Sequence, residues 1–223
     1  MIPWKLLDTA TVPDGGGQLR LMQRGAEFSI MAGSIELMNS RLSGSEQALA
    51  DLAFALIADR PRPDVLIGGL GMGFTLRAAL TARPEATITV AELVPAVAAW
   101  ARGPLAGVLG SSLDDPHVRL EIADVARLIR AHTAAYDAIL LDVDNGPEGL
   151  TRRGNEAIYS PTGLRAAHIA LRPGGVLAVW SAHPSAEFTR RLVTAGFAVD
   201  EIPVRARGSK GARHTIWLAK PPA

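Results

Sequence analysis

From about residue 64 onward, short apolar runs alternate with amphipathic stretches. The stretches carry apolar residues at helical spacing, and the runs are rich in residues typical of strands. The predicted strands are 64–68, 86–92, 117–124, 136–142 and 174–182, and the predicted helices between and after them are 74–82, 95–106, 125–132, 160–171 and 185–196. Alternation of this kind predicts an α/β fold, doubly wound and Rossmann-like, with a mostly parallel sheet whose two faces are covered by helices.

The ends of the chain depart from this alternation. Residues 18–39 hold short runs with partial alternation, separated at Gly25 and Gly33, which predict a small antiparallel meander. A helix is expected from Ser45, as its N-cap, to the proline-containing segment 60–64. We therefore expect a small N-terminal β region, 1–44, and a Rossmann-like domain, 45–223, which is the part of the chain that holds the candidate residues for ligand binding and catalysis. A final hairpin, 197–206 with 214–220, would bring the sheet to seven strands with an antiparallel last strand.

Composition excludes several classes of protein. Of 223 residues, 48% are hydrophobic and 20% charged, which predicts a folded domain rather than a disordered chain. The net charge of +1 gives no overall field that would attract nucleic acid or a membrane surface, so neither partner is expected. Cys is absent, which excludes disulfides and thiolate chemistry, and the five His show no metal-ligand spacing, so no metal is expected. The N-terminus does not resemble a signal peptide and no apolar run could span a bilayer, so the expected location is cytoplasmic.

A glycine-rich segment between the first predicted strand and helix of the large domain is the main candidate for ligand binding. It contains Gly68, Gly69, Gly71 and Gly73, and Glu92 ends the next strand. Glycines let a ligand approach the backbone, the helix N-terminus adds free N–H groups, and an acid at this distance binds ribose hydroxyls in nucleotide-binding units. The pattern is G-x-G-x-G, without the third glycine of the dinucleotide motif or the lysine of a phosphate-binding loop. It predicts a nucleoside without a long phosphate chain, with a simple tight turn as the alternative.

Three aspartates follow predicted strands at the same edge of the sheet. Asp124 is either a helix cap or a contact to an adenine amino group. Asp142 and Asp144 follow the apolar strand 136–142 and are candidates for taking a proton from a nucleophile or holding a cationic amine. Turn formation is the alternative for both. Trp180, at the end of a later strand, is expected in the core or at the pocket wall.

These segments resemble the class I S-adenosylmethionine-binding fold and, within it, the spermidine synthase (polyamine aminopropyltransferase) family. IGGLGMG is similar to the family's GGGDGG loop, AELVP to its acid-bearing second strand, EIADV to its GDA-type segment and YDAILLDVDNGP to its YDVIIVDSSDP segment. The resemblance implies transfer of an aminopropyl group from decarboxylated S-adenosylmethionine to an amine. It also implies a possible homodimer formed through the N-terminal meander.

The resemblance also implies roles for residues. Asp142 would hold the attacking amine, with Asp144 as a second catalytic acid. The donor, decarboxylated or intact S-adenosylmethionine, would be bound as a co-substrate by Gly68, Gly69, Gly71, Gly73, Glu92, Leu93, Asp124, Val125 and Asp142. Within this set, Glu92 would bind the ribose and Asp124 the adenine.

The chain departs from the family where the acceptor would bind. Gly71 replaces the aspartate of the glycine loop, Asn145 the second acid of D-x-x-D, Glu36 a glutamine, and Ser45 the tyrosine of the segment that closes over the diamine; Arg41 replaces an acid. These differences count against putrescine as the acceptor.

A basic hairpin suggests an alternative substrate. Its residues are Arg205, Arg207, Lys210, Arg213 and His214. They form either a solvated tip or a rim of the entrance that favours an anionic substrate. Two other functions therefore stay open. One is an S-adenosylmethionine-dependent methyltransferase for a small molecule, which the basic rim would favour as an anion. The other is a non-catalytic nucleoside-binding or scaffold protein.

Overall fold

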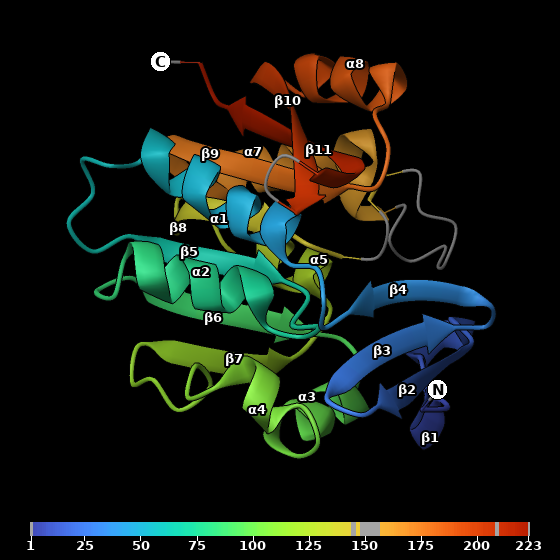
Figure 1. Cartoon of the computed structure of the whole chain (residues 1–223). Helices are drawn as coiled ribbons and strands as arrows, with labels where there is room; N and C mark the ends of the chain where they lie inside the picture. The colour runs from blue at the N-terminus through green and yellow to red at the C-terminus, as the bar shows by residue number, and fades with distance from the viewer. Residues whose placement is uncertain (1, 144–145, 148–156, 208–209, 223) are drawn as a thin grey trace.

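A computed structural model describes residues 2–143, 146–147, 157–207 and 210–222. The chain forms two sheets, a small antiparallel one at the N-terminus and a large one flanked by helices (Figure 1). Asp144, one of the predicted catalytic residues, and Asn145 lie outside the described residues. No helix in the described part of the chain is long and apolar enough to cross a membrane.

The small sheet has one strand more than the sequence predicts. Its order is β1-β2-β3-β4, with the bounds Lys5–Thr11, Gln18–Arg24, Glu27–Ala32 and Ile35–Asn39, and every pairing is antiparallel. Strand β1 was not predicted because its alternation is interrupted: the pairing with β2 shifts register between Leu6 and Asp8. The Asp8 carboxylate accepts a 2.7 Å hydrogen bond from the Trp100 indole, which ties this strand to the large domain.

The large sheet confirms the predicted Rossmann-like class. Its order is β10-β11-β9-β8-β5-β6-β7. The strands are β5 (Asp64–Gly68), β6 (Thr87–Glu92), β7 (Val118–Ile122), β8 (Tyr136–Leu141), β9 (Leu171–Ser181), β10 (Ala198–Arg207) and β11 (Lys210–Lys220). Strands β5 to β9 pair with one another in parallel, and β11 is antiparallel to both β9 and β10. The carboxyl ends of β5, β6, β7, β8 and β9 therefore meet at one edge, and β10 ends at this edge too.

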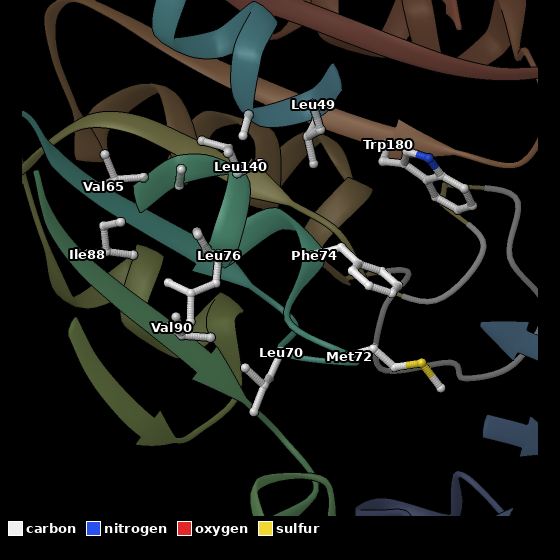
Figure 2. Packing of buried hydrophobic residues seen from close by; sticks show 14 of the residues in the cluster. Leu49, Val65, Leu70, Met72, Phe74, Leu76, Ile88, Val90, Leu140 and Trp180 are labelled. Carbon is white, nitrogen blue, oxygen red and sulfur yellow. The ribbon is translucent and has the colours of Figure 1, made fainter. Parts of the chain in front are cut away.

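Helices cover both faces of this sheet (Figure 1). They are α1 (Gly44–Leu56), α2 (Phe74–Ala82), α3 (Pro95–Arg102), α4 (Ala106–Leu109), α5 (Val125–Ala131), α7 (Pro161–Ala170) and α8 (Ala186–Thr194). Successive residues of the central strands β5 and β8 alternate between two core clusters, since side chains along a strand point to opposite faces. Figure 2 shows part of one cluster, in which Leu49 of α1 and Leu76 of α2 pack with sheet residues such as Val90. The other cluster joins the sheet to α5, α7 and α8.

Helix α1 begins before the residue that the sequence suggests as its cap. Ser43 is the N-cap, and Ser45 lies inside the first turn, fully buried. The Ser45 hydroxyl donates to the Glu46 carboxylate at 2.6 Å instead of accepting from the backbone. The prediction of Ser45 as the N-cap is therefore wrong, because tertiary packing takes this side chain into the interior.

Candidate functional site

A cavity lies at the carboxyl edge of the large sheet, where the small sheet meets it. The glycine loop, the ends of β6 and β8, the start of α1 and residues of β2, β3 and β4 form its walls. Apolar side chains supply most of the lining. The polar groups that converge on it are four carboxylates: Glu46, Glu92, Asp124 and Asp142.

Two glycines of the loop face the cavity, and two support the packing behind it. Gly69 and Gly71 line the cavity with φ of 91° and 50°. A Cβ on Gly69 would meet the Asp142 carbonyl oxygen, and one on Gly71 would meet the Met38 side chain from β4. Gly68 and Gly73 are not among the lining residues: Gly68 packs on Val125 and Leu141, and Gly73 is the N-cap of α2.

Glu92 ends β6 in the wall of the cavity and is only 7% exposed. Its carboxylate accepts hydrogen bonds from the backbone N–H groups of Leu70 (3.0 Å) and Val94 (2.8 Å). Burial raises the pKa of this carboxyl above its usual value, and these backbone donors act in the opposite direction. The carboxylate that holds the backbone of the glycine loop therefore also forms part of the cavity wall.

Asp124 caps a helix and also lies in the wall of the cavity. Its Oδ1 caps α5 by accepting from the Ala126 N–H at 2.8 Å. The residue also lines the cavity, together with Val125. Capping uses one carboxylate oxygen and leaves Oδ2 for a ligand, so the two roles are compatible.

Asp142 and Glu46 place two negative charges in the same cavity. Asp142 follows β8 and accepts a 2.6 Å hydrogen bond from the Thr75 hydroxyl at the start of α2. Burial, and then the charge of Glu46, raise the pKa of Asp142 to about 7, against the effect of the Thr75 hydrogen bond. Burial likewise raises the pKa of Glu46, against the hydrogen bond from Ser45. Two partly buried carboxylates that repel each other favour a cation between or beside them.

The sequence analysis did not identify Glu46. Its position held a signal: Glu46 shares a face of α1 with Leu49, Ala50 and Ala53, at the spacing of a buried stripe. An acid on such a face needs a partner or a function. The signal was hidden because an acidic residue in a first helical turn is favourable on its own.

The basic hairpin contributes no side chain to the described lining of the cavity. Arg205 donates to the Gly211 carbonyl within the hairpin at 3.2 Å, and His214 contacts the Ser45 hydroxyl. Trp180 lines the cavity and is also part of the core, 7% exposed. With four carboxylates and no Lys, Arg or His in its described lining, the cavity favours a cationic ligand over the anionic one suggested by the hairpin.

Comparison with known sequences points to one group of enzymes. Polyamine aminopropyltransferase 2 of Pseudomonas aeruginosa is 31% identical over 154 residues, which cover 67% of this chain and 42% of that protein. The polyamine aminopropyltransferase of Mycobacterium tuberculosis is 31% identical over 157 residues, which cover 66% of this chain and 29% of the relative. The chain thus matches less than half the length of either relative. No protein-family model matches it.

Solved structures share the fold over nearly the whole chain. The spermidine synthase of Thermotoga maritima aligns with a TM-score of 0.77 and 18% identity, over 96% of this chain and 72% of that one. A spermidine synthase in complex with the transition-state analogue AdoDATO gives 0.74 over the same shares of the two chains. Human methyltransferase-like protein 13 in complex with SAH gives 0.58 with 19% identity, over 80% of this chain and 79% of that one. The chain is thus related in sequence to the polyamine aminopropyltransferases and has the fold of the spermidine synthases.

Proposed function

We propose that this chain is a transferase that moves the aminopropyl group of decarboxylated S-adenosylmethionine to a small amine. The observation that carries the proposal is the pair Glu46 and Asp142, two carboxylates beside the glycine loop in an otherwise apolar cavity. A sulfonium donor with a free amino group and an ammonium acceptor are both cations. They would relieve the repulsion that raises the pKa of Asp142.

The donor would lie along the carboxyl ends of β5, β6 and β7. Glu92 would accept from the ribose hydroxyls, and the free Oδ2 of Asp124 from the adenine amino group. Gly69 and Gly71 allow the loop its conformation along the cavity, because both have positive φ and a Cβ on either would collide with the protein. Leu93 and Val125 would supply apolar contact to the base, since both line the cavity.

Asp142 would hold the acceptor amine in line with the reacting carbon. The amine nitrogen gives up a proton, and its lone pair attacks the methylene group next to the sulfonium. The carbon–sulfur bond then breaks, and its electron pair stays on sulfur as a neutral thioether, methylthioadenosine. The protein supplies proximity and charge placement, because the sulfonium is already a good leaving group.

Methyl transfer from intact S-adenosylmethionine is the second candidate. It is favoured by the fold shared with human methyltransferase-like protein 13 and by the departures from the family at Gly71 and Ser45. The acidic lining counts against it, since a donor carboxylate would lie near the charges of Glu46 and Asp142. A non-catalytic nucleoside-binding protein is the third candidate.

Calorimetric titration with three ligands tests the proposal. Methylthioadenosine measures binding of the shared nucleoside, and the decarboxylated and intact donors differ only by a carboxylate. We expect the decarboxylated donor to bind at least about tenfold more tightly than the intact one, because like charges within a partly buried site cost more than about 1.4 kcal/mol. Preference for the intact donor would replace aminopropyl transfer with methyl transfer. Nucleoside binding without turnover on any linear diamine would favour the non-catalytic alternative.

A further inference from the structure

A continuous chain of hydrogen bonds leads from the cavity to the final hairpin. The Glu46 carboxylate accepts from the Ser45 hydroxyl at 2.6 Å, and the Ser45 oxygen lies 2.8 Å from Nδ1 of His214. Glu46 lines the cavity, Ser45 is fully buried, and His214 is partly exposed on β11. The chain therefore joins a carboxylate in the cavity to an ionisable ring at the surface.

The fold holds both ends of this chain in place. The His214 ring packs edge-on against Trp180 of β9, with 4.8 Å between the ring centroids. The start of α1 lies directly on the hairpin, where a Cβ on Gly44 would meet the carbonyl oxygen of Ala206. This close approach brings Ser45 and His214 together although 169 positions separate them in the sequence. The contact depends on tertiary structure, and it is not a local turn.

Aminopropyl transfer has to dispose of a proton. The acceptor enters as an ammonium ion, since alkyl amines have pKa values of about 10, and only the neutral amine can attack. The new carbon–nitrogen bond yields a secondary ammonium, and the sulfonium charge disappears. Charge therefore balances only if one proton leaves the cavity in each turnover.

We propose that Glu46 accepts this proton from the acceptor ammonium and that Ser45 and His214 conduct it out of the cavity. This inference rests on the proposed function for its substrate, but the hydrogen-bond chain stands on geometry alone. In this assignment Glu46 is a catalytic residue, because it contacts the amine. Ser45 and His214 act through it and are relay residues.

The transfer is balanced at every atom. Protonated Glu46 donates to the Ser45 oxygen, while the Ser45 hydroxyl proton passes to Nδ1 of His214. The result is a Glu46 carboxylate that accepts from Ser45 and a ring whose Nδ1–H donates to Ser45, which is the donor order that the Glu46–Ser45 hydrogen bond shows. The imidazolium then releases its Nε2 proton to solvent, and tautomer exchange through solvent frees Nδ1 again.

The surroundings of His214 favour release of the proton. Burial and then the charge of His183 lower the pKa of His214 below its usual value. Glu46, through Ser45, is the acidic group on the other side of the ring. The lowered pKa favours the neutral ring over the imidazolium, which suits a residue that passes its proton to solvent.

The kinetic test interrupts the relay at two points. Turnover is measured with decarboxylated S-adenosylmethionine and a series of linear diamines. Ser45→Ala and His214→Ala should each lower kcat at least about tenfold, with KM changed less than about threefold. This is less than the roughly 10²- to 10⁴-fold typical of a group that transfers the substrate proton itself, because both residues act through Glu46. Added imidazole should restore much of the rate of His214→Ala and none of that of Ser45→Ala. A purely structural His214 would not give this rescue.

His117→Gln is the matched control, because it changes an exposed histidine outside the hydrogen-bond chain and outside the described lining of the cavity. Its kcat should stay within about twofold of the wild-type value. Methylthioadenosine affinity and the thermal midpoint, measured for all variants, show whether each is folded. If both relay variants keep kcat near the wild-type value while the wild type turns over, the relay is wrong and the proposed function stands.

A second measurement does not depend on activity. The ring nitrogens of His214 are followed by NMR during a pH titration of the full chain. When Ser45 is present, Glu46→Gln should shift the pKa of His214 by about half a unit or more. When Ser45 is replaced by alanine, the same Glu46→Gln change should shift the pKa of His214 by much less. If the wild type turns over no substrate, the proposed function fails. The pKa measurement still tests the hydrogen-bond chain, because it does not require turnover. Equal shifts in both backgrounds would overturn the relay.

Discussion

Strand β8 has an acidic residue near each end, Asp137 and Asp142. The first has cations as neighbours, and the second has another carboxylate. Asp137, near the start, is 2% exposed, and two arginines balance its charge. Arg172 contacts it at 2.7 Å and Arg60 at 3.2 Å, and the backbone N–H of Asp64 donates to it at 2.9 Å. Asp142, just past the end, has the Thr75 hydroxyl as its neutral donor and Glu46 as a like-charged neighbour.

The difference separates a structural charge from a functional one. At the amino edge the fold supplies its own cations, so a ligand has nothing to neutralise. At the carboxyl edge the fold leaves two carboxylates in a cavity without a cation among its described lining residues. Uncompensated charge is unfavourable for folding, and its presence in a cavity favours a role in binding a cationic substrate.

Substitution of Asp142 tests the functional side of this comparison and should have the largest effect. Asp142→Asn keeps the shape of the side chain and removes its charge. We expect kcat for aminopropyl transfer to fall about 10²- to 10⁴-fold, while methylthioadenosine affinity changes little. Steady-state kinetics and calorimetry measure the two quantities. A rate near that of the wild type would make Asp142 a turn residue only.

Substitution of Asp137 tests the structural side. Asp137→Asn leaves Arg60 and Arg172 without their shared partner, so the free energy of unfolding should fall by about 3 kcal/mol. Urea denaturation measures this change. Glu121→Gln is the matched control, because it breaks the exposed ion pair with Arg119 and should cost less than about 1 kcal/mol. Equal losses in the two variants would show that Asp137 is not specially stabilising.

The dependence of stability on pH provides a third test. The pKa of Asp142 is about 7 in the folded chain and near its ordinary value when unfolded. Between about pH 4 and pH 7 the unfolded state ionises first, so the folded state loses stability as pH rises. The free energy of unfolding of Asp142→Asn, compared with that of the wild type, should therefore rise by on the order of 2 kcal/mol across this pH range. The whole pKa shift would give a larger rise, but solvent screens part of it. If the free energies of unfolding of the two proteins differ by the same amount from about pH 4 to pH 8, the pKa of Asp142 is not raised.

Substitutions of Asp124 should have the smallest effect on stability. They distinguish its role as a helix cap from its proposed role in ligand binding. Asp124→Ala removes both, and should lower the free energy of unfolding by about 1 kcal/mol and weaken methylthioadenosine binding. Asp124→Ser retains a capping oxygen, so stability should recover while binding stays weak. Thermal unfolding and calorimetry report the two effects. Recovery of binding in the serine variant would remove Asp124 from the ligand site.

Much of the large domain could be predicted from its local pattern. The predicted strand 64–68 and helix 74–82 match β5 and α2, because an apolar run, a glycine loop and a helical stripe occur in sequence there. The break at Gly103 between α3 and α4 was missed, since the apolar spacing continues through it. Strand β1 was missed because its bulge destroys the alternation. The homodimer and the cytoplasmic location stay predictions.

Only some residues of the candidate site could be predicted from the sequence. Glu92, Asp124 and Asp142 could be identified because each ends a parallel strand or directly follows one, and the carboxyl ends of such strands share an edge. The contact of Ser45 with His214 could not be predicted, because packing places α1 beside β11 over a long sequence separation. The sequence alone determined the sheet, the glycine loop and the acids at its edge, since these follow from local periodicity and chain direction. Only the tertiary structure decided which charges are paired, as at Asp137, and which face a cavity, since that depends on side chains brought together from distant segments.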